Sequence, residues 1–477
     1  MSLAKKLAWL TGVQILTRVF SIGLGVFLVY QVLHYLDPSN FGRYSLVLSI
    51  IQIVVTVADL GLYLIATKEI AGKDHGTSSK YFSSIITFRI LSSALFLFVL
   101  LATIPFLSYD RTVKLGLVFT SLMIISLSMN QVLMSIFQKH HRTNSLAVIE
   151  LLAKAAMVVF TQLSIMYGLG IYYLLQALSV ATLLQTVALL VLAYRQIPFS
   201  FEISKESLRN VAKQAWPLAL SVIFTTVFFR GDSLALSWLR PVRDVGIYNA
   251  SFRILETLSG FPILFVGLVL PYLASTYSEK NLVGFRHYFT RAFDAVIVIT
   301  LPMITTFIVL SQPIINFIAG PEYHDSAHLL QILMIGTGLL YFIALPAHAI
   351  TLIGKQKLMM YFYLGAALVA SLGYYFFIPR YGYWAAAWVV VVAQLIVFLS
   401  SQGIIWYSTG ALPRFVTFLK SLIGCVIMGI VMSKLTMPFW VVAMIGGGVY
   451  GACVVALGVI PFHELRSWMR VQKEEGV

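Results

Sequence analysis

L-D-P-S-N-F-G-R-Y, residues 36–44, opens the stretch of sequence that decides the fold. A mostly apolar segment of about twenty residues, the length that crosses a bilayer, follows it. The stretch then ends with A-D-L-G-L-Y-L-I-A-T-K-E-I-A at 58–71. This pattern predicts a short polar turn and a membrane-spanning helix that carries one acid, Asp59, near its far end.

A second copy of this opening occurs in the other half of the chain. The repeat pairs Leu36, Pro38, Gly42 and Tyr44 with Leu239, Pro241, Gly246 and Tyr248, Tyr81-Phe82 with Tyr288-Phe289, and Tyr167-Gly168 with Tyr381-Gly382. An even number of predicted spans separates the copies, so both halves enter the membrane in the same direction. Transporters with such parallel repeats place the substrate between the halves.

The composition excludes a water-soluble protein. Of the 477 residues, 59% are hydrophobic and only 11% are charged, whereas soluble domains carry about 25% charged residues. Apolar runs of membrane length recur along the chain, and the alternating pattern of a transmembrane barrel is absent. The two cysteines, Cys425 and Cys453, both lie in apolar runs and exclude a disulfide framework.

The fold class expected is therefore an all-α polytopic membrane protein with about fourteen spans. The predicted spans are 7–33, 44–67, 81–107, 113–137, 145–166, 170–194, 214–238, 246–275, 288–316, 326–353, 358–378, 382–407, 414–432 and 437–460. They are grouped as an N-lobe (1–194, six spans), a cytoplasmic linker (195–213), a C-lobe (214–407, six spans), and two further spans with a tail (408–477). The first span is interpreted as uncleaved, because it is too long for a signal-peptide core.

The net charge of +15 is explained largely by the loops. About 20 of the 33 Lys and Arg residues fall in one set of loops and termini and about 7 in the other, which is the positive-inside bias. We therefore expect both termini in the cytoplasm and the protein in the cell inner membrane. Nucleic acid is not needed to explain the charge.

Several basic residues remain inside the predicted spans. They are Arg18, Arg89, Lys154, Arg230, Arg253 and Lys420. An arginine at the middle of a membrane costs about 2.5–3.5 kcal/mol on insertion scales, so such residues face an interior cavity or a partner. Lys420 lies near a span end and can extend to the interface.

Polar side chains also recur at helical spacing in the predicted spans. Thr11, Gln14, Arg18, Ser21 and Gly25 form one stripe, and Ser128, Gln131, Ser135 and Gln138 form another. Either stripe can line a cavity or supply hydrogen bonds between helices. Arg253 and Glu256, three residues apart, can pair on one helix, as can Glu150 and Lys154, four apart. Arg230 and Asp232 point about 200° apart and do not pair directly.

Taken in order, these motifs resemble the lipid-linked oligosaccharide flippases of polysaccharide and O-antigen assembly. That family belongs to the multidrug/oligosaccharidyl-lipid/polysaccharide exporter superfamily. The matching stretches are 36–45, A-D-L-G-L at 58–62, K-E-I-A at 68–71, R-G-D-S-L-A-L at 230–236, V-G-I-Y-N-A-S-F-R-I-L-E at 245–256, G-P-E-Y at 320–323 and I-P-R-Y-G-Y-W-A-A-A at 378–387. The dense arginine pattern of the lipid II flippases is not found in the first two spans.

The resemblance implies two six-helix lobes in a V around a central cavity, with two extra C-terminal helices. It also implies a flippase, not an enzyme, that carries an undecaprenyl-diphosphate-linked oligosaccharide to the outer leaflet by alternating access. Partners to expect are that lipid-linked glycan, the membrane, and the polymerase and chain-length regulator of the same pathway.

The expected substrate carries a diphosphate, which guanidinium groups bind through paired donors. The candidate contacts to the diphosphate and glycan are Arg18, Arg89, Arg230, Arg253, Gln14 and Lys154. No G-x-x-x-x-G-K-[ST] motif occurs, so we expect coupling to Na⁺ or H⁺ and no bound cofactor or metal. The candidate coupling acids are Asp59, Asp232 and Glu256.

Two other functions remain open at this point. A cation-coupled multidrug exporter would share the fold but should have a more acidic pocket. A polytopic glycan polymerase or glycosyltransferase would need long external loops with catalytic acids or histidines, and the predicted outward loops are short. The sequence does not identify the glycan.

Overall fold

A computed structural model of the chain describes residues 3–59, 75–139, 143–195, 230–258 and 261–459. Every regular element in these ranges is an α-helix or a short 3₁₀ helix, as expected for an all-α membrane protein. Hydrocarbon offers no hydrogen bonds, so a helix that satisfies its own backbone is the stable form of such apolar segments.

Ten helices in the described ranges are long and apolar enough to cross a membrane, or eleven if one bent pair counts as a single span. The chain is therefore a multi-pass membrane protein. The predicted total of fourteen also includes the span 7–33, whose side chains are described only in part, and the span 214–238, of which only residues 230–238 are described.

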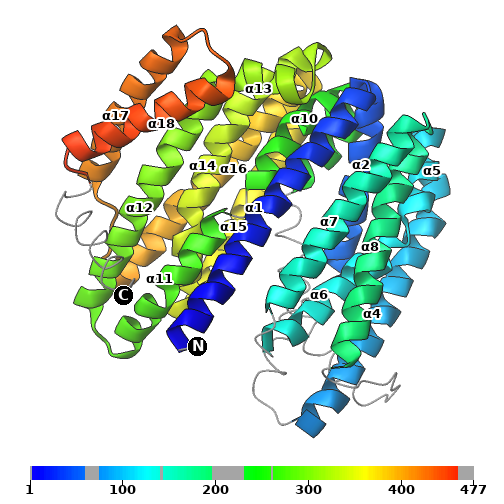
Figure 1. Cartoon of the computed structure of the whole chain (residues 1–477), viewed down its shortest axis with the longest axis horizontal. Helices are drawn as coiled ribbons and strands as arrows, with labels where there is room; N and C mark the ends of the chain where they lie inside the picture. Colours follow the sequence, from blue (N-terminus) through cyan, green and yellow to red (C-terminus); the bar gives the residue numbers. More distant parts are fainter. Residues whose placement is uncertain (1–2, 60–74, 140–142, 196–229, 259–260, 460–477) are drawn as a thin grey trace. The chain divides into compact units, whose positions relative to one another are not determined.

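By their packing, the residues form two units. The first comprises Met1–Ala250 and Tyr374–Tyr383. Its helices are α1 (Leu3–Tyr35), α2 (Pro38–Asp59), α4 (His75–Thr103), α5 (Arg111–Thr120), α6 (Met123–Lys139), α7 (Thr143–Met166), α8 (Ile171–Tyr194) and the first part of α10 (Val242–Leu258). Helix α2 packs against α4, α5 and α6, and α8 packs against α5, α6 and α7 (Figure 1).

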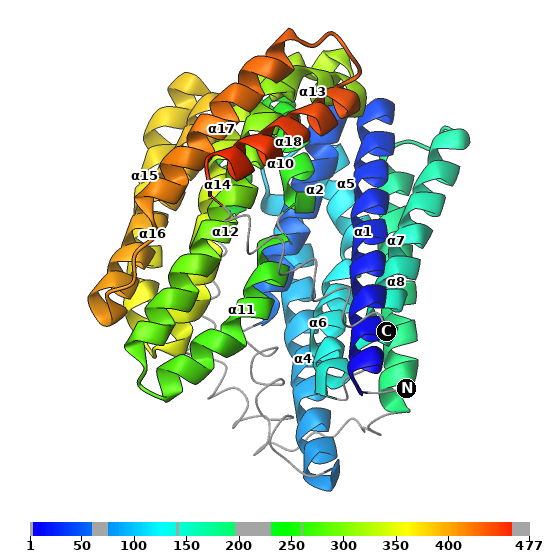
Figure 2. The same cartoon turned by 60° about the vertical axis from the view of Figure 1, so that its left-hand side comes forward.

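The second unit comprises Ser251–Gly373 and Trp384–Val477. Its helices are the end of α10, α11 (Phe261–Ser278), α12 (Leu282–Val309), α13 (Ser311–Ile318), α14 (His324–Leu352), most of α15 (Gln356–Tyr381), α16 (Tyr383–Thr409), α17 (Phe415–Lys434) and α18 (Phe439–Ala456). Helix α12 packs against α11, α14 and α17 (Figure 2). The N-lobe and C-lobe were predicted from the sequence repeat. The two packed units have a different boundary, which lies inside α10.

One predicted span is interrupted within the described residues. The span predicted at 113–137 consists of α5 and α6, which meet at a bend of 41°. At this bend the hydroxyl groups of Thr120 and Ser121 donate to the carbonyls of Gly116 and Val118, each at 2.7 Å, and such back-bonding bends helices. The described residues of the span predicted at 246–275 belong to α10 and α11.

The backbone conformation supports the sequence repeat at the repeated Tyr-Gly pair. Gly168 and Gly382, each directly after a tyrosine, have φ of +64° and +57°. Both lie between two helices, and this left-handed conformation favours glycine because it has no Cβ. The two copies therefore connect their helices in the same way at this position.

Candidate functional site

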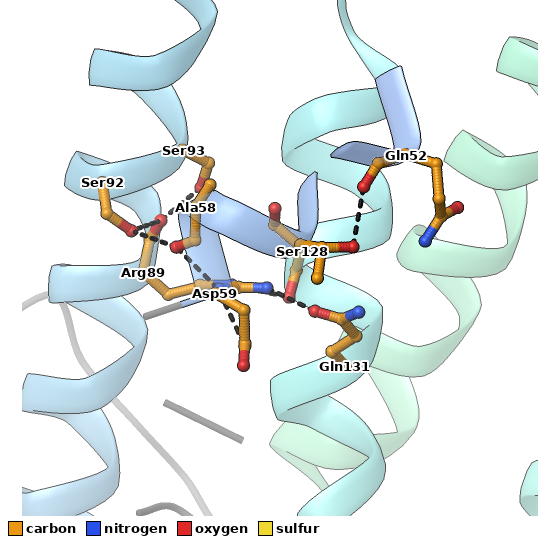
Figure 3. Close-up of polar contacts among 9 residues, drawn as sticks. Gln52, Ala58, Asp59, Arg89, Ser92, Ser93, Ser128 and Gln131 are labelled. Carbon is orange, nitrogen blue, oxygen red and sulfur yellow. Dashed lines mark hydrogen bonds and ion pairs between the residues drawn. The ribbon is translucent and has the colours of Figure 1, made fainter. Parts of the chain in front are cut away.

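The guanidinium group of Arg89 is the centre of a buried polar cluster in the first unit. Its side chain is fully buried, with 0% exposed. Nε donates to the carbonyl of Ser128 at 2.9 Å, Nη1 to the carbonyl of Ala58 at 2.9 Å, and Nη2 to Oε1 of Gln131 at 2.6 Å. Nη1 also lies 3.0 Å from Oδ1 of Asp59. One arginine of α4 thus joins α2 and α6 (Figure 3).

The position of Arg89 follows from the helices around it. Ala58 and Asp59 are the last described residues of α2. Arg89 on the neighbouring α4 donates to the carbonyl of Ala58 and lies against the carboxylate of Asp59. Ser92, one turn further along α4, also donates to the carbonyl of Ala58, at 3.4 Å.

The predicted role of Arg89 as a substrate contact stays a prediction, and the geometry in this structure favours another role. As a contact to a diphosphate it would have to present free donors, but here the side chain has no exposed surface and its donors bind protein oxygens. Asp59, predicted as a coupling acid, is the partner that neutralises it. In this structure the pair holds three helices together rather than facing a substrate.

The polar stripe predicted along the second half of the 113–137 span serves the same cluster. The Ser128 carbonyl and the Gln131 side chain both accept from Arg89. Ser135 is buried and donates to the carbonyl of Val132 in its own helix, at 2.6 Å. Of the two interpretations, hydrogen bonding within the bundle is the one observed here for these residues; the side chain of Gln138 lies outside the described part.

The stripe on the first helix is described in part. Gln14 and Arg18 lie in α1, and their side chains lie outside the described residues. Lys154, near the middle of α7, donates from Nζ to the carbonyl of Ser21 in α1 at 3.1 Å. The structure thus brings the ammonium group of Lys154 to the turn of α1 that follows Arg18.

Asp232 forms a second buried cluster in the first unit. It lies in the helix of residues 230–239, with 2% of its surface exposed. One carboxylate oxygen accepts from the hydroxyl of Tyr248 at 2.6 Å and the other from the backbone N–H of Ser233 at 2.7 Å. The hydroxyl of Ser233 in turn donates to Asn249 at 3.1 Å. Arg230, in the same helix, is half-buried.

The predicted pair on α10 is confirmed. Nη1 of Arg253 lies 2.8 Å from Oε2 of Glu256, with 21% and 31% of the two side chains exposed. Both groups therefore pair with each other and remain accessible, unlike Arg89. Arg253 therefore remains a candidate for substrate contact, and Glu256 remains a candidate for ion coupling.

Sequence reasoning did not identify the partners that complete these clusters. Tyr248 was visible as the repeat equivalent of Tyr44, but nothing in the sequence indicated that its hydroxyl binds Asp232. The carbonyls of Ala58 and Ser128 carry no sequence signal at all, because every residue has a carbonyl.

Two protein-family models match this chain. A family model described as polysaccharide biosynthesis protein matches residues 3–277, and one described as MatE matches residues 217–376. A search of curated protein sequences finds no significant match.

Solved structures are similar over most of the chain. A lipid II flippase MurJ in an inward closed conformation has a TM-score of 0.76 at 16% identity, covering 94% of this chain and 98% of that one. An inward-facing multidrug resistance MATE family transporter has a TM-score of 0.64 at 16% identity, covering 82% and 95%. A transporter of the MOP superfamily from Pyrococcus furiosus has a TM-score of 0.58 at 14% identity, covering 83% and 95%. At these identities the likeness shows the fold alone.

Proposed function

Because this chain belongs to the polysaccharide biosynthesis protein family, within the multidrug/oligosaccharidyl-lipid/polysaccharide exporter superfamily, we propose that it is a flippase for a lipid-linked oligosaccharide. The substrate is an undecaprenyl-diphosphate-linked glycan that moves from the cytoplasmic to the outer leaflet by alternating access. The protein lies in the inner membrane with both termini in the cytoplasm. The polymerase and chain-length regulator of the same pathway are its proposed partners.

Basic charge inside membrane-length helices is the observation that carries this proposal. Lys154 lies near the middle of a 23-residue apolar span with its ammonium group half-buried. A cation at that depth is costly unless it meets water or an anion. In the proposed function such cations bind the diphosphate through charge-assisted hydrogen bonds, while its lipid tail stays in the bilayer.

The candidate substrate contacts differ in how strongly the structure supports them. Arg89 is committed to Asp59 and is no longer proposed. Arg18, Gln14, Lys154 and Arg230 are proposed for the diphosphate and glycan. Arg253 is proposed as a contact that can exchange Glu256 for a substrate oxygen, since both side chains are partly exposed.

Among the coupling acids we favour Asp232. Its carboxylate is buried, accepts from Tyr248 and Ser233 and has Arg230 as an electrostatic neighbour, whereas Asp59 and Glu256 form direct ion pairs with arginines. A buried carboxylate that accepts from a hydroxyl and an amide is better suited to bind and release Na⁺ or H⁺. One charge moving across 100 mV is worth about 2.3 kcal/mol, enough to bias a transport cycle.

A second candidate function is a cation-coupled multidrug exporter. The match of the MatE model to residues 217–376 favours it. The cargo of such an exporter is cationic, and basic residues inside the apolar spans, such as Lys154, suit an anionic cargo better. This charge argument is why the lipid-linked glycan is preferred.

Replacing Arg18 with alanine is expected to stop glycan export in cells. After depletion of the wild-type protein, lipid-linked glycan should accumulate on the cytoplasmic leaflet, and wild type but not Arg18→Ala should restore export. Arg111→Ala is the matched control, because Arg111 is exposed at the start of α5. Full rescue by Arg18→Ala at normal protein levels would contradict the proposed contact.

A further inference from the structure

Two conspicuous stretches of the sequence meet at one end of the second unit. G-P-E-Y at 320–323 leads directly into α14, which begins at His324. I-P-R-Y-G-Y-W-A-A-A at 378–387 contains Trp384, in the first turn of α16. The ring centroids of His328 in α14 and Trp384 lie 6.3 Å apart. The starts of α14 and α16 are therefore neighbours, and neither belongs to the clusters of Arg89 and Asp232.

Three aromatic rings form a row across these helix starts. The ring of His328 lies 6.2 Å from the ring of His324 and 6.3 Å from the ring of Trp384, measured between centroids. The side chain of His324 is 67% exposed, His328 is exposed and Trp384 is half-buried. Rings that serve packing alone are covered, as Tyr323 is, with 1% of its surface exposed. The row instead lies at the surface of the unit.

The backbone fixes the position of the row. Gly320 has φ of +90°, a conformation that favours glycine, where the chain turns from α13 into the 3₁₀ helix Pro321–Tyr323. One turn into α14, the carbonyl of Ser326 accepts from the hydroxyl of Ser251 in α10 at 2.5 Å. Side chains on such anchored helix starts are pre-organised, which reduces the entropy cost of binding a ligand.

The charges beside the row are acidic. Glu322 and Asp325 are both exposed, with 50% of the Asp325 side chain accessible. Residues 320–328 and 381–388 contain no lysine or arginine, and the nearest basic residue in the sequence is Arg380, which belongs to the first unit. Carboxylates accept hydrogen bonds from hydroxyl groups and repel anions. The row and its acids therefore suit a neutral, hydroxyl-rich ligand and not a diphosphate.

We infer that His324, His328 and Trp384, with Glu322 and Asp325, form a binding surface for the sugar rings of the glycan. The inference rests on the proposed function for the identity of the ligand, and it concerns the glycan without its diphosphate. The apolar C–H face of a sugar packs on the indole and imidazole rings, and its hydroxyls donate to the two carboxylates. Loop charge predicts that this end of the unit faces outward, so the surface holds the glycan where it leaves the protein.

An aromatic belt at the membrane surface is the simpler explanation for an exposed tryptophan. It accounts for Trp406, which is 58% exposed near the other end of α16. It does not account for the two imidazoles and two carboxylates that accompany Trp384. Trp406→Leu is therefore the matched control for Trp384→Leu, because it removes a ring of the same type from the same helix.

The test measures binding of a free glycan to the full-length protein in detergent. The probe is the oligosaccharide released by mild acid from the lipid-linked glycan of the cells that make the protein, so it carries neither lipid nor diphosphate. A chelator is present, so that a metal on the histidines does not contribute. Saturation-transfer NMR detects the bound sugar and gives its Kd. Trp384→Leu should bind about tenfold more weakly than wild type, since leucine keeps the apolar bulk and loses the ring face.

A second variant covers the case in which Trp384→Leu does not fold. The double variant His324→Ala with His328→Ala changes only exposed side chains, and it should also bind about tenfold more weakly. Trp406→Leu should bind like wild type, and inorganic pyrophosphate should not displace the oligosaccharide. Unchanged binding in the folded variants, an equal loss in Trp406→Leu, or displacement by pyrophosphate would overturn the inference.

A leaflet-exchange assay with the lipid-linked glycan separates this inference from the proposed function. Binding that depends on Trp384, with no movement of the lipid-linked glycan, would reject the flippase and leave the sugar surface standing. Movement of the lipid-linked glycan, with wild-type binding by Trp384→Leu, would reject the sugar surface and leave the flippase standing. Failure of the wild-type protein to bind the free oligosaccharide would likewise overturn the inference, whatever the transport result.

Discussion

Arg89→Ala is expected to destabilise the protein by about 3–5 kcal/mol, the usual cost of removing one partner of a buried ion pair. The change leaves Asp59 without its arginine and removes the donors to the carbonyls of Ala58 and Ser128. We expect the purified protein to unfold at a clearly lower temperature in detergent, or to be lost during membrane insertion. Arg89→Lys should recover only part of the stability, because an ammonium group cannot reach all three helices in the same geometry.

Arg253→Ala is the matched control for this prediction. It removes the same charge from a pair that is partly exposed, and such pairs contribute about 1 kcal/mol or less. A double-mutant cycle of Arg89→Ala with Asp59→Ala isolates the energy of the pair itself. If Arg89→Ala were as stable as wild type and lost only transport, Arg89 would be a substrate contact after all.

The second large effect is expected for Asp232→Asn. Asparagine preserves the shape of the side chain: its oxygen can accept from the Ser233 amide while its NH2 group donates to the hydroxyl of Tyr248, but it cannot carry the charge that binds Na⁺ or releases H⁺. Gradient-driven transport in reconstituted vesicles should fall at least tenfold, while the unfolding temperature changes little. The measurement compares uptake with an imposed Na⁺ gradient, an imposed pH gradient and no gradient.

Tyr248→Phe separates structure from coupling at this site. It removes the hydroxyl donor but keeps the carboxylate, so it should cost about 1–3 kcal/mol of stability and retain a response to the gradient. Asp59→Asn and Glu256→Gln serve as the parallel tests of the other two acids. Retention of full gradient dependence in Asp232→Asn would assign coupling to another group.

Sequence reasoning identified the helices well where the apolar runs are long and uninterrupted. The predicted spans 145–166 and 170–194 correspond closely to α7 and α8. It joined α5 to α6 because hydropathy does not register the bend at Ser121, which depends on hydroxyl groups bonding back to the helix. Hydropathy measures burial in the bilayer, not the course of the backbone.

The site was harder to predict than the fold because pairing depends on which helices are neighbours. Arg253 and Glu256 share a helix, so their ion pair follows from spacing alone and is confirmed. Arg89 and Asp59 lie 30 residues apart on different helices, so spacing does not pair them, and sequence reasoning assigned them separate roles. Similarly, the repeat relates Gly42 to Gly246, but only the packing shows that the two residues touch.

Direct observation of the cargo crossing a bilayer is the most decisive test of the proposed function. Purified protein is reconstituted into vesicles that contain a fluorescent polyprenyl-diphosphate-linked oligosaccharide, and a membrane-impermeant glycosidase reports which leaflet holds the glycan. The account predicts that wild type exchanges the lipid between leaflets, that Arg18→Ala does so at least tenfold more slowly, and that a cationic dye is not moved. Transport of the dye with no movement of the lipid-linked glycan would contradict the account and favour the multidrug exporter.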